Sequence, residues 1–101
     1  MTVGKLKKQI SWDQLSAAVE KAVQETLRAS GRPPVPLFDG MRVLIAVDGF
    51  DSLTGIEAAF LVAAELGCDL NKDIEYFKTR DGARAATLAE AVARMAEELG
   101  I

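Results

Sequence analysis

The chain contains only one segment with the composition of a buried β-strand, residues 42–47, which read Arg-Val-Leu-Ile-Ala-Val between two glycines. A strand needs a neighbouring strand to pair its backbone N–H and C=O groups. Since no second such segment exists, we expect an all-α fold in which these residues belong to a long loop pinned to a helical core. The alternative is a small α/β domain, in which this segment is a strand and the turn at 49–52 binds a phosphate.

Hydrophobic periodicity predicts a first helix over residues 12–30. Ser11 and Gln14 have the spacing of a capping box, in which each side chain bonds the backbone N–H of the other residue. Gly31 and the prolines that follow it prevent the helix from continuing. Apolar side chains recur every three or four residues, on one helical face; they are Trp12, Leu15, Val19, Val23 and Leu27.

A second helix is predicted from a cap at Asp51 or Ser52 to a stop at Gly67. Aspartate and serine are both preferred at the N-cap, and glycine is common just past a helix end. Apolar side chains surround nearly the whole of this helix. Because a core of about 100 residues can hardly enclose one helix completely, we expect part of this apolar surface to be available to a partner.

Two further helices complete the prediction. Residues 70–77 are expected to form a short third helix with Asn71 as its cap. The last helix begins with a capping box of Thr87 and Glu90 and ends before Gly100. The predicted fold is therefore an all-α four-helix bundle, with three longer helices, one short helix and a long loop between the first two.

Length and composition narrow the classes of function. A chain of 101 residues is one small domain, residues 1–101, in which we read residues 1–10 as a flexible tail. It lacks histidine and has one cysteine, Cys68, which excludes Ser-His-Asp catalysis, an intramolecular disulfide and a cysteine metal cluster. No apolar run is long enough to span a membrane, and no signal-peptide pattern follows the basic start, so we expect a cytoplasmic protein.

The charge distribution argues against nucleic acid as a partner and favours a basic protein surface. The net charge is −3, and residues 33–77 hold eight acidic side chains but only two basic ones. Acidic surfaces repel phosphate backbones and speed encounters with basic proteins. A separate basic cluster of Lys78, Arg80 and Arg84 reads as ordinary solvated charge.

The start of the predicted second helix carries the five-residue motif Gly-Phe-Asp-Ser-Leu at 49–53, followed by Ile56 and Glu57. The stretch Leu-Gly-Cys-Asp-Leu at 66–70 then ends the helix. With the long loop before it, this arrangement resembles the acyl carrier protein family, whose pattern is Gly-x-Asp-Ser-Leu at the start of the second helix. The resemblance covers residues 11–99 and is strongest from the motif to the end of that helix.

This resemblance implies a carrier protein without catalytic activity of its own. Ser52 would receive a 4′-phosphopantetheine group from coenzyme A through a separate phosphopantetheinyl transferase, and the thiol of this arm would hold acyl groups as thioesters. Acyl ligases, synthases or transferases of fatty acid, polyketide or related secondary biosynthesis would be its partners. A serine at a helix N-terminus suits this role, because a phosphodiester there lies at the positive end of the helix dipole. We expect such a carrier to be a monomer.

The same resemblance assigns partner recognition to residues around the modified serine. Asp51 matches the acid that precedes the serine, and it is equally suited to capping the helix. Leu53, Ile56 and Phe60 match exposed apolar positions, and their spacing of three and four residues places them on one helical face. Glu57 matches an acidic recognition position. The alternative is that the apolar face belongs to the core and that the acid is a solvated charge.

Two departures from the family pattern indicate a specialised member. Thr54 stands where many carriers have an acid, and a net charge of −3 is mild for a strongly acidic family. We therefore expect a carrier dedicated to a particular ligase or synthase. Two other functions remain open: an aminoacyl or peptidyl carrier, and an unmodified helical interaction domain that binds a partner through Leu53, Ile56 and Phe60.

Overall fold

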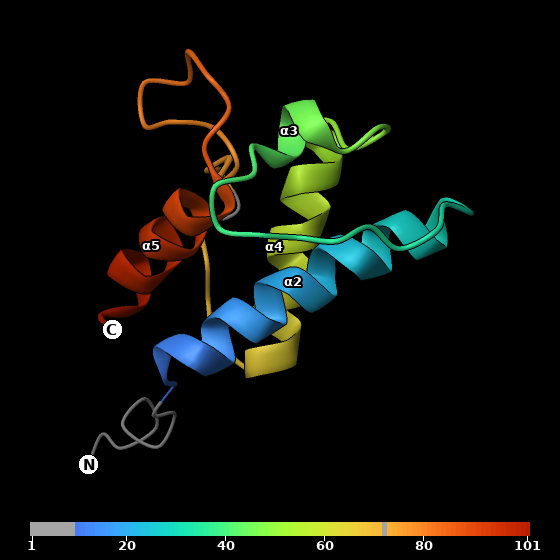
Figure 1. Ribbon diagram of the computed structural model, residues 1–101. Helices are drawn as coiled ribbons and strands as arrows, with labels where there is room; N and C mark the ends of the chain where they lie inside the picture. The colour runs from blue at the N-terminus through green and yellow to red at the C-terminus, as the bar shows by residue number, and fades with distance from the viewer. Residues whose placement is uncertain (1–9, 72) are drawn as a thin grey trace.

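The computed structural model describes residues 10–71 and 73–101. Within those residues the chain forms no β-strand and four helices, α2 (Trp12–Ala29), α3 (Val43–Ala46), α4 (Ser52–Leu66) and α5 (Leu88–Leu99) (Figure 1). The prediction of an all-α fold with three longer helices, one short helix and a long loop is confirmed, but the short helix is α3, which lies within that loop. None of these helices has the length and hydropathy needed to cross a membrane. The tail predicted over residues 1–10 lies, except for Ile10, outside the described residues.

The long helices begin and end where short-range sequence signals place them. Ser11 Oγ accepts the Gln14 N–H at 3.0 Å, and Gln14 Oε1 accepts the Ser11 N–H at 2.8 Å. Thr87 and Glu90 form the same reciprocal pair at the start of α5. Both α4 and α5 are followed by a glycine in the left-handed conformation, which satisfies carbonyl groups at the helix end.

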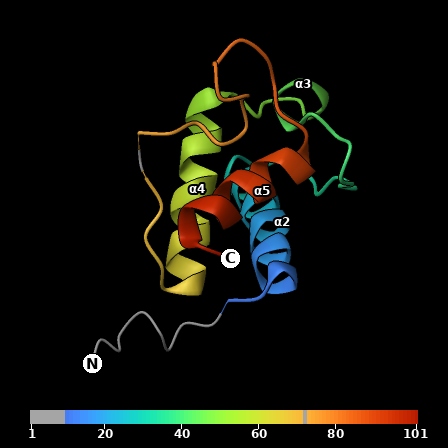
Figure 2. The ribbon, with the colours of Figure 1, turned by 90° about the vertical axis from the view of Figure 1, so that its left-hand side faces the viewer.

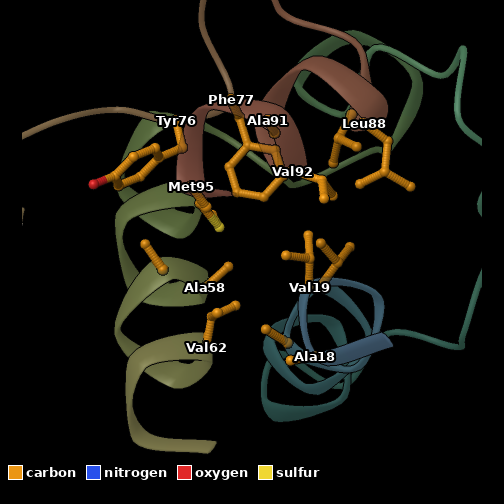
Figure 3. Packing of buried hydrophobic residues seen from close by; sticks show 14 of the residues in the cluster. Ala18, Val19, Ala58, Val62, Tyr76, Phe77, Leu88, Ala91, Val92 and Met95 are labelled. Carbon is orange, nitrogen blue, oxygen red and sulfur yellow. The ribbon is translucent and has the colours of Figure 1, made fainter. Parts of the chain in front are cut away.

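One core lies between the three long helices. α2 packs along α4, and α5 crosses over the pair (Figures 1 and 2). Figure 3 shows side chains from each helix directed at a common centre, where the Phe77 ring also lies, while the ring of Tyr76 points away from that centre on the α4 side. Val19, Val62 and Met95, one from each long helix, are fully buried there. The apolar face predicted for α2 therefore lies in this core from Leu15 to Leu27, whereas Trp12 at its start is 47% exposed.

The loop between α2 and α4 contains a single helical turn, α3, where the alternative prediction placed a strand. Val43 and Val47 are buried in the core, whereas Ile45 between them is 74% exposed. The Val47 N–H donates to the Val43 carbonyl, a bond within one turn of helix. The loop interpretation is thus confirmed, and the strand interpretation is wrong, because no strand in the described part of the chain is available to pair with it.

The same loop is joined to the start of α5. The Leu88 N–H donates to the Met41 carbonyl at 2.7 Å, and Arg42 and Thr87 form an isolated antiparallel bridge. These contacts satisfy a backbone N–H that the first turn of a helix leaves without an internal partner. They also bring the two ends of the segment 42–87, which contains α3 and α4, side by side.

The short helix predicted over residues 70–77 is wrong, because the described residues of this segment lie in turns and irregular structure. The Asn71 side-chain oxygen accepts the Asp73 N–H at 2.8 Å, and the Asn71 N–H donates to the Tyr76 hydroxyl at 3.0 Å. Such side-chain bonds compete with helical backbone bonds. In addition, Tyr76 and Phe77 are neighbours in the chain and both are buried. The turns in this segment allow both side chains to be buried.

Candidate functional site

Ser52 is the first residue of α4 and is half-buried. Asp51 caps this helix: its Oδ1 accepts the Thr54 N–H and the Thr54 hydroxyl, each at 2.9 Å. These bonds, with the backbone N–H as the largest cause, hold the pKa of Asp51 below its ordinary value. Asp51 therefore remains an exposed carboxylate and has the capping role predicted for it. Its role in partner recognition stays a prediction.

The two residues before Asp51 fix where the helix begins. Phe50 is 2% exposed and meets Phe77 edge to face, with ring centroids 5.2 Å apart. Gly49 has a φ of +84°, and a β-carbon there would lie 2.5 Å from the Arg32 guanidinium. Arg32 in turn pairs with Asp48 at 3.2 Å. The buried Phe50 ring and the close approach of Gly49 to Arg32 thus fix the position of Ser52. Sequence analysis did not identify this contact of Arg32.

A second close approach lies one turn into α4. A β-carbon at Gly55 would be 2.7 Å from a carboxylate oxygen of Glu75, so the missing side chain makes room for this acid. Glu75 Oε1 accepts the Phe77 N–H at 3.0 Å, and Oε2 is buried without a hydrogen-bond partner among the described residues. Burial raises the pKa of Glu75, against the opposing effect of the Phe77 bond. Sequence analysis missed Glu75; a glycine inside a helix was the available signal.

The predicted recognition residues lie along the outer side of α4. Leu53 is 65% and Phe60 54% exposed, and Glu57 between them is also exposed. Ile56 is half-buried at the edge of this group. We call Leu53, Glu57 and Phe60 the outer face of α4. The opposite side of the helix, which includes Ala58 and Val62, is buried against the core (Figure 3).

An open cavity of about 670 Å³ lies beside Ser52. Three segments line it: α3 with the residue before it, the start of α4, and the loop 78–85. Its charged lining residues are Arg42, Asp51, Lys78 and Arg84, and Leu44 and Ile45 contribute apolar surface. We call this space the basic cavity.

Short-range hydrogen bonds shape the loop that forms one wall of the basic cavity. The Thr79 N–H donates to the Arg84 carbonyl at 2.8 Å. Asp81 Oδ1 accepts the Thr79 hydroxyl at 2.6 Å and the Ala83 N–H at 3.0 Å. The hydroxyl bond is the largest cause of a lowered pKa at Asp81. A bond of 2.6 Å from the Arg42 guanidinium to the Ala85 carbonyl ties this loop to the opposite wall.

The basic cluster expected to be solvated is divided by the fold. Arg80 pairs with Glu97 on α5, whereas Lys78 and Arg84 line the basic cavity with Ser52. The structure thus brings Ser52 and Asp51 together with cations that sequence analysis had not linked to them. Cys68 is half-buried just past the end of α4, and the described residues contain no acid or cysteine cluster arranged to hold a metal ion.

Comparison with protein families, curated proteins and solved structures finds no match to this chain. The resemblance to acyl carrier proteins therefore stays a prediction, based on the motif at 49–53 and its place in the chain.

Proposed function

We propose that this protein is an acyl carrier and that Ser52 is its attachment site for 4′-phosphopantetheine. The observation that carries the proposal is the place of Ser52, at the first turn of a 15-residue helix and on the lining of a cavity with three basic side chains. A phosphodiester carries one negative charge, which both the helix N-terminus and these cations favour. The residues present therefore fit the phosphate end of the arm.

The proposed modification requires only the Ser52 hydroxyl from the protein itself. Coenzyme A is the donor, and the Ser52 oxygen forms the new bond to phosphorus while adenosine 3′,5′-bisphosphate leaves. A separate transferase supplies the base and the metal ion for this step. The carrier then holds an acyl group as a thioester on the arm, for cytoplasmic ligases, synthases or transferases of fatty acid, polyketide or related biosynthesis.

A second candidate function has its own support in the outer face of α4. Leu53 and Phe60 expose large apolar side chains to solvent, as a protein-binding surface does. An unmodified interaction domain would use this face and would leave Ser52 as part of the first helical turn. The two functions differ in one measurable property, which is the chemical state of Ser52.

The decisive experiment is covalent modification of the purified chain. We expect incubation with coenzyme A, Mg²⁺ and a broad-specificity phosphopantetheinyl transferase to add one phosphopantetheinyl group, measured by intact mass. Ser52→Ala should gain nothing, while Ser30→Ala, at an exposed serine after α2, should gain the group like the wild type. Circular dichroism of each variant confirms that the helices are retained.

A wild-type chain that stays unmodified by a transferase proven active on a known carrier contradicts the proposal. The same holds if Ser52→Ala is modified to the same extent. Either result favours the unmodified interaction domain.

A further inference from the structure

The basic cavity holds more positive than negative charge. Arg42, Lys78 and Arg84 line it, and Asp51 is the one acid on its lining. Cations that line one cavity repel each other. An anion bound between them reduces this repulsion. The composition of the lining therefore fits a negatively charged ligand.

None of the three cations has a carboxylate partner in a salt bridge of the described residues, and Arg42 bonds a backbone carbonyl instead. Among the described residues, neither Lys78 nor Arg84 takes part in a salt bridge, although Arg80 in the same loop pairs with Glu97. Three acids feel the charge of these cations, and each is engaged in another bond: Glu75 accepts the Phe77 N–H, Asp81 accepts the Thr79 hydroxyl, and Glu90 accepts the Thr87 N–H. None of these acids lines the cavity.

Arg42, the third cation, joins two walls of the cavity. The Arg42 guanidinium donates to the Ala85 carbonyl at 2.6 Å, which fixes its charge at the junction of the two walls. Leu44 and Ile45 extend the same wall as apolar surface, and Ile45 is 74% exposed. The cavity thus offers cations and an uncovered apolar surface side by side, next to Ser52.

We infer that the basic cavity is a docking site for an anionic group tethered to Ser52, with Lys78 and Arg84 as its charge partners and with Leu44 and Ile45 as the surface on which the apolar part of the tether lies. This inference rests on the proposed function, since it requires the modification of Ser52. It adds that the arm lies along α3 and the loop 78–85 of its own protein, and is not fully extended into solvent.

The test compares amide chemical shifts of the unmodified and the modified ¹⁵N-labelled protein. We expect modification to shift the amides of residues 42–45 and 78–85 in addition to those next to Ser52. In the double variant Lys78→Gln/Arg84→Gln, purified in fully modified form, we expect most of these distant shifts to be lost. The double variant Lys21→Gln/Arg28→Gln removes the same charge from exposed residues of α2 outside the cavity lining and should keep them.

Two sources supply a suitable anion, namely the phosphodiester of the arm and a carboxylate on its cargo. Three loaded states distinguish them: the arm with a free thiol, an acetyl thioester, and a succinyl half-thioester. Shifts that are complete with the free thiol identify the phosphodiester as the anion. Shifts that arise only with the succinyl group identify the cargo carboxylate. Added NaCl should reduce the shifts in either case, because salt screens charge pairs at the surface.

The outcomes separate this inference from the proposed function. Failure of Ser52 to gain mass contradicts the proposed function. Complete modification without shifts in residues 42–45 and 78–85 in any loaded state overturns the inference alone. Shifts that survive unchanged in Lys78→Gln/Arg84→Gln also overturn it, since they would not depend on the cations of the cavity. Circular dichroism and the shifts of core amides establish that each variant is folded.

Discussion

Glu75 places a carboxylate against the backbone of α4, one turn after Ser52. One of its oxygens bonds the Phe77 N–H, and the other is buried without a hydrogen-bond partner in the described part of the chain. A buried acceptor without a partner costs free energy, and it costs more when the group is charged. At this residue, loss of the negative charge therefore stabilises the folded state.

We expect Glu75→Gln to raise the free energy of unfolding at neutral pH. Burial raises the pKa of Glu75 above its ordinary value of 4.5, so the unfolded chain loses this proton at a lower pH than the folded chain. The contribution of Glu75 to the stability of the wild type is therefore lost as pH rises from 4.5 through the raised pKa. The variant lacks this loss, because glutamine does not titrate. Urea unfolding of both proteins at several pH values measures the difference, which should be smallest below pH 4.5.

Glu57→Gln is the control for this prediction, because Glu57 is an exposed acid on α4, the helix against which Glu75 packs. A stability difference of one size at every pH would contradict the burial argument. So would an equal effect of the control substitution.

Among the elements, α5 depends on a cap that also contacts the loop before α4. Thr87 Oγ1 accepts the Glu90 N–H at 3.1 Å, while Thr87 itself forms the isolated bridge with Arg42. We expect Thr87→Ala to cost about 1 kcal/mol of stability, which lowers Tm by roughly 4–8 °C for a domain of this size. Thermal unfolding followed by circular dichroism measures this change.

Thr87→Ser keeps the capping oxygen and should keep most of the stability. If the serine variant loses as much as the alanine variant, the methyl group of Thr87 and not its cap is responsible.

The elements that could be predicted are those whose ends depend on neighbouring residues. The capping boxes at Ser11 and Thr87 and the glycine after α4 act within a few positions, so the sequence alone locates them. Residues 70–77 could not be predicted in this way. Their conformation depends on the burial of Tyr76 and Phe77 in the core beside α4 and α5 (Figure 3), which no signal within the segment itself specifies.

On the scale of the whole molecule, the outer face of α4 is the surface that the proposed function assigns to partner enzymes. We expect Leu53→Gln to reduce kcat/KM for modification by the transferase about fivefold or more, the equivalent of about 1 kcal/mol lost at an interface anchor. Stability should change by less than about 0.5 kcal/mol, because Leu53 is exposed. Initial rates of mass gain at limiting carrier concentration measure the effect.

Ile101→Gln is the matched control, since Ile101 is an exposed aliphatic residue after α5 and far along the chain from this face. An equal loss in both variants would show that general hydrophobicity, and not the outer face of α4, determines the rate.

The basic cavity could not be predicted from the sequence, although the place of Ser52 at the start of a helix could. Ser52 belongs to a contiguous motif, whereas the walls of the cavity come from three separate segments of the chain. Lys78 and Arg80 are two residues apart, yet one lines the cavity and the other pairs with Glu97. Only the folded loop, shaped by Asp81, separates their roles.

The bridge between Arg42 and Thr87 makes nearly half of the chain a closed loop that contains α3, α4 and the loop 78–85. The entropy lost on closing a loop increases with its length, and only the packing of the enclosed helices compensates for it. The bond from Arg42 to the Ala85 carbonyl joins the two walls of the basic cavity near that closure. The cavity is therefore a property of the whole cooperative unit, and it keeps its shape only while the closed loop and the core are folded together.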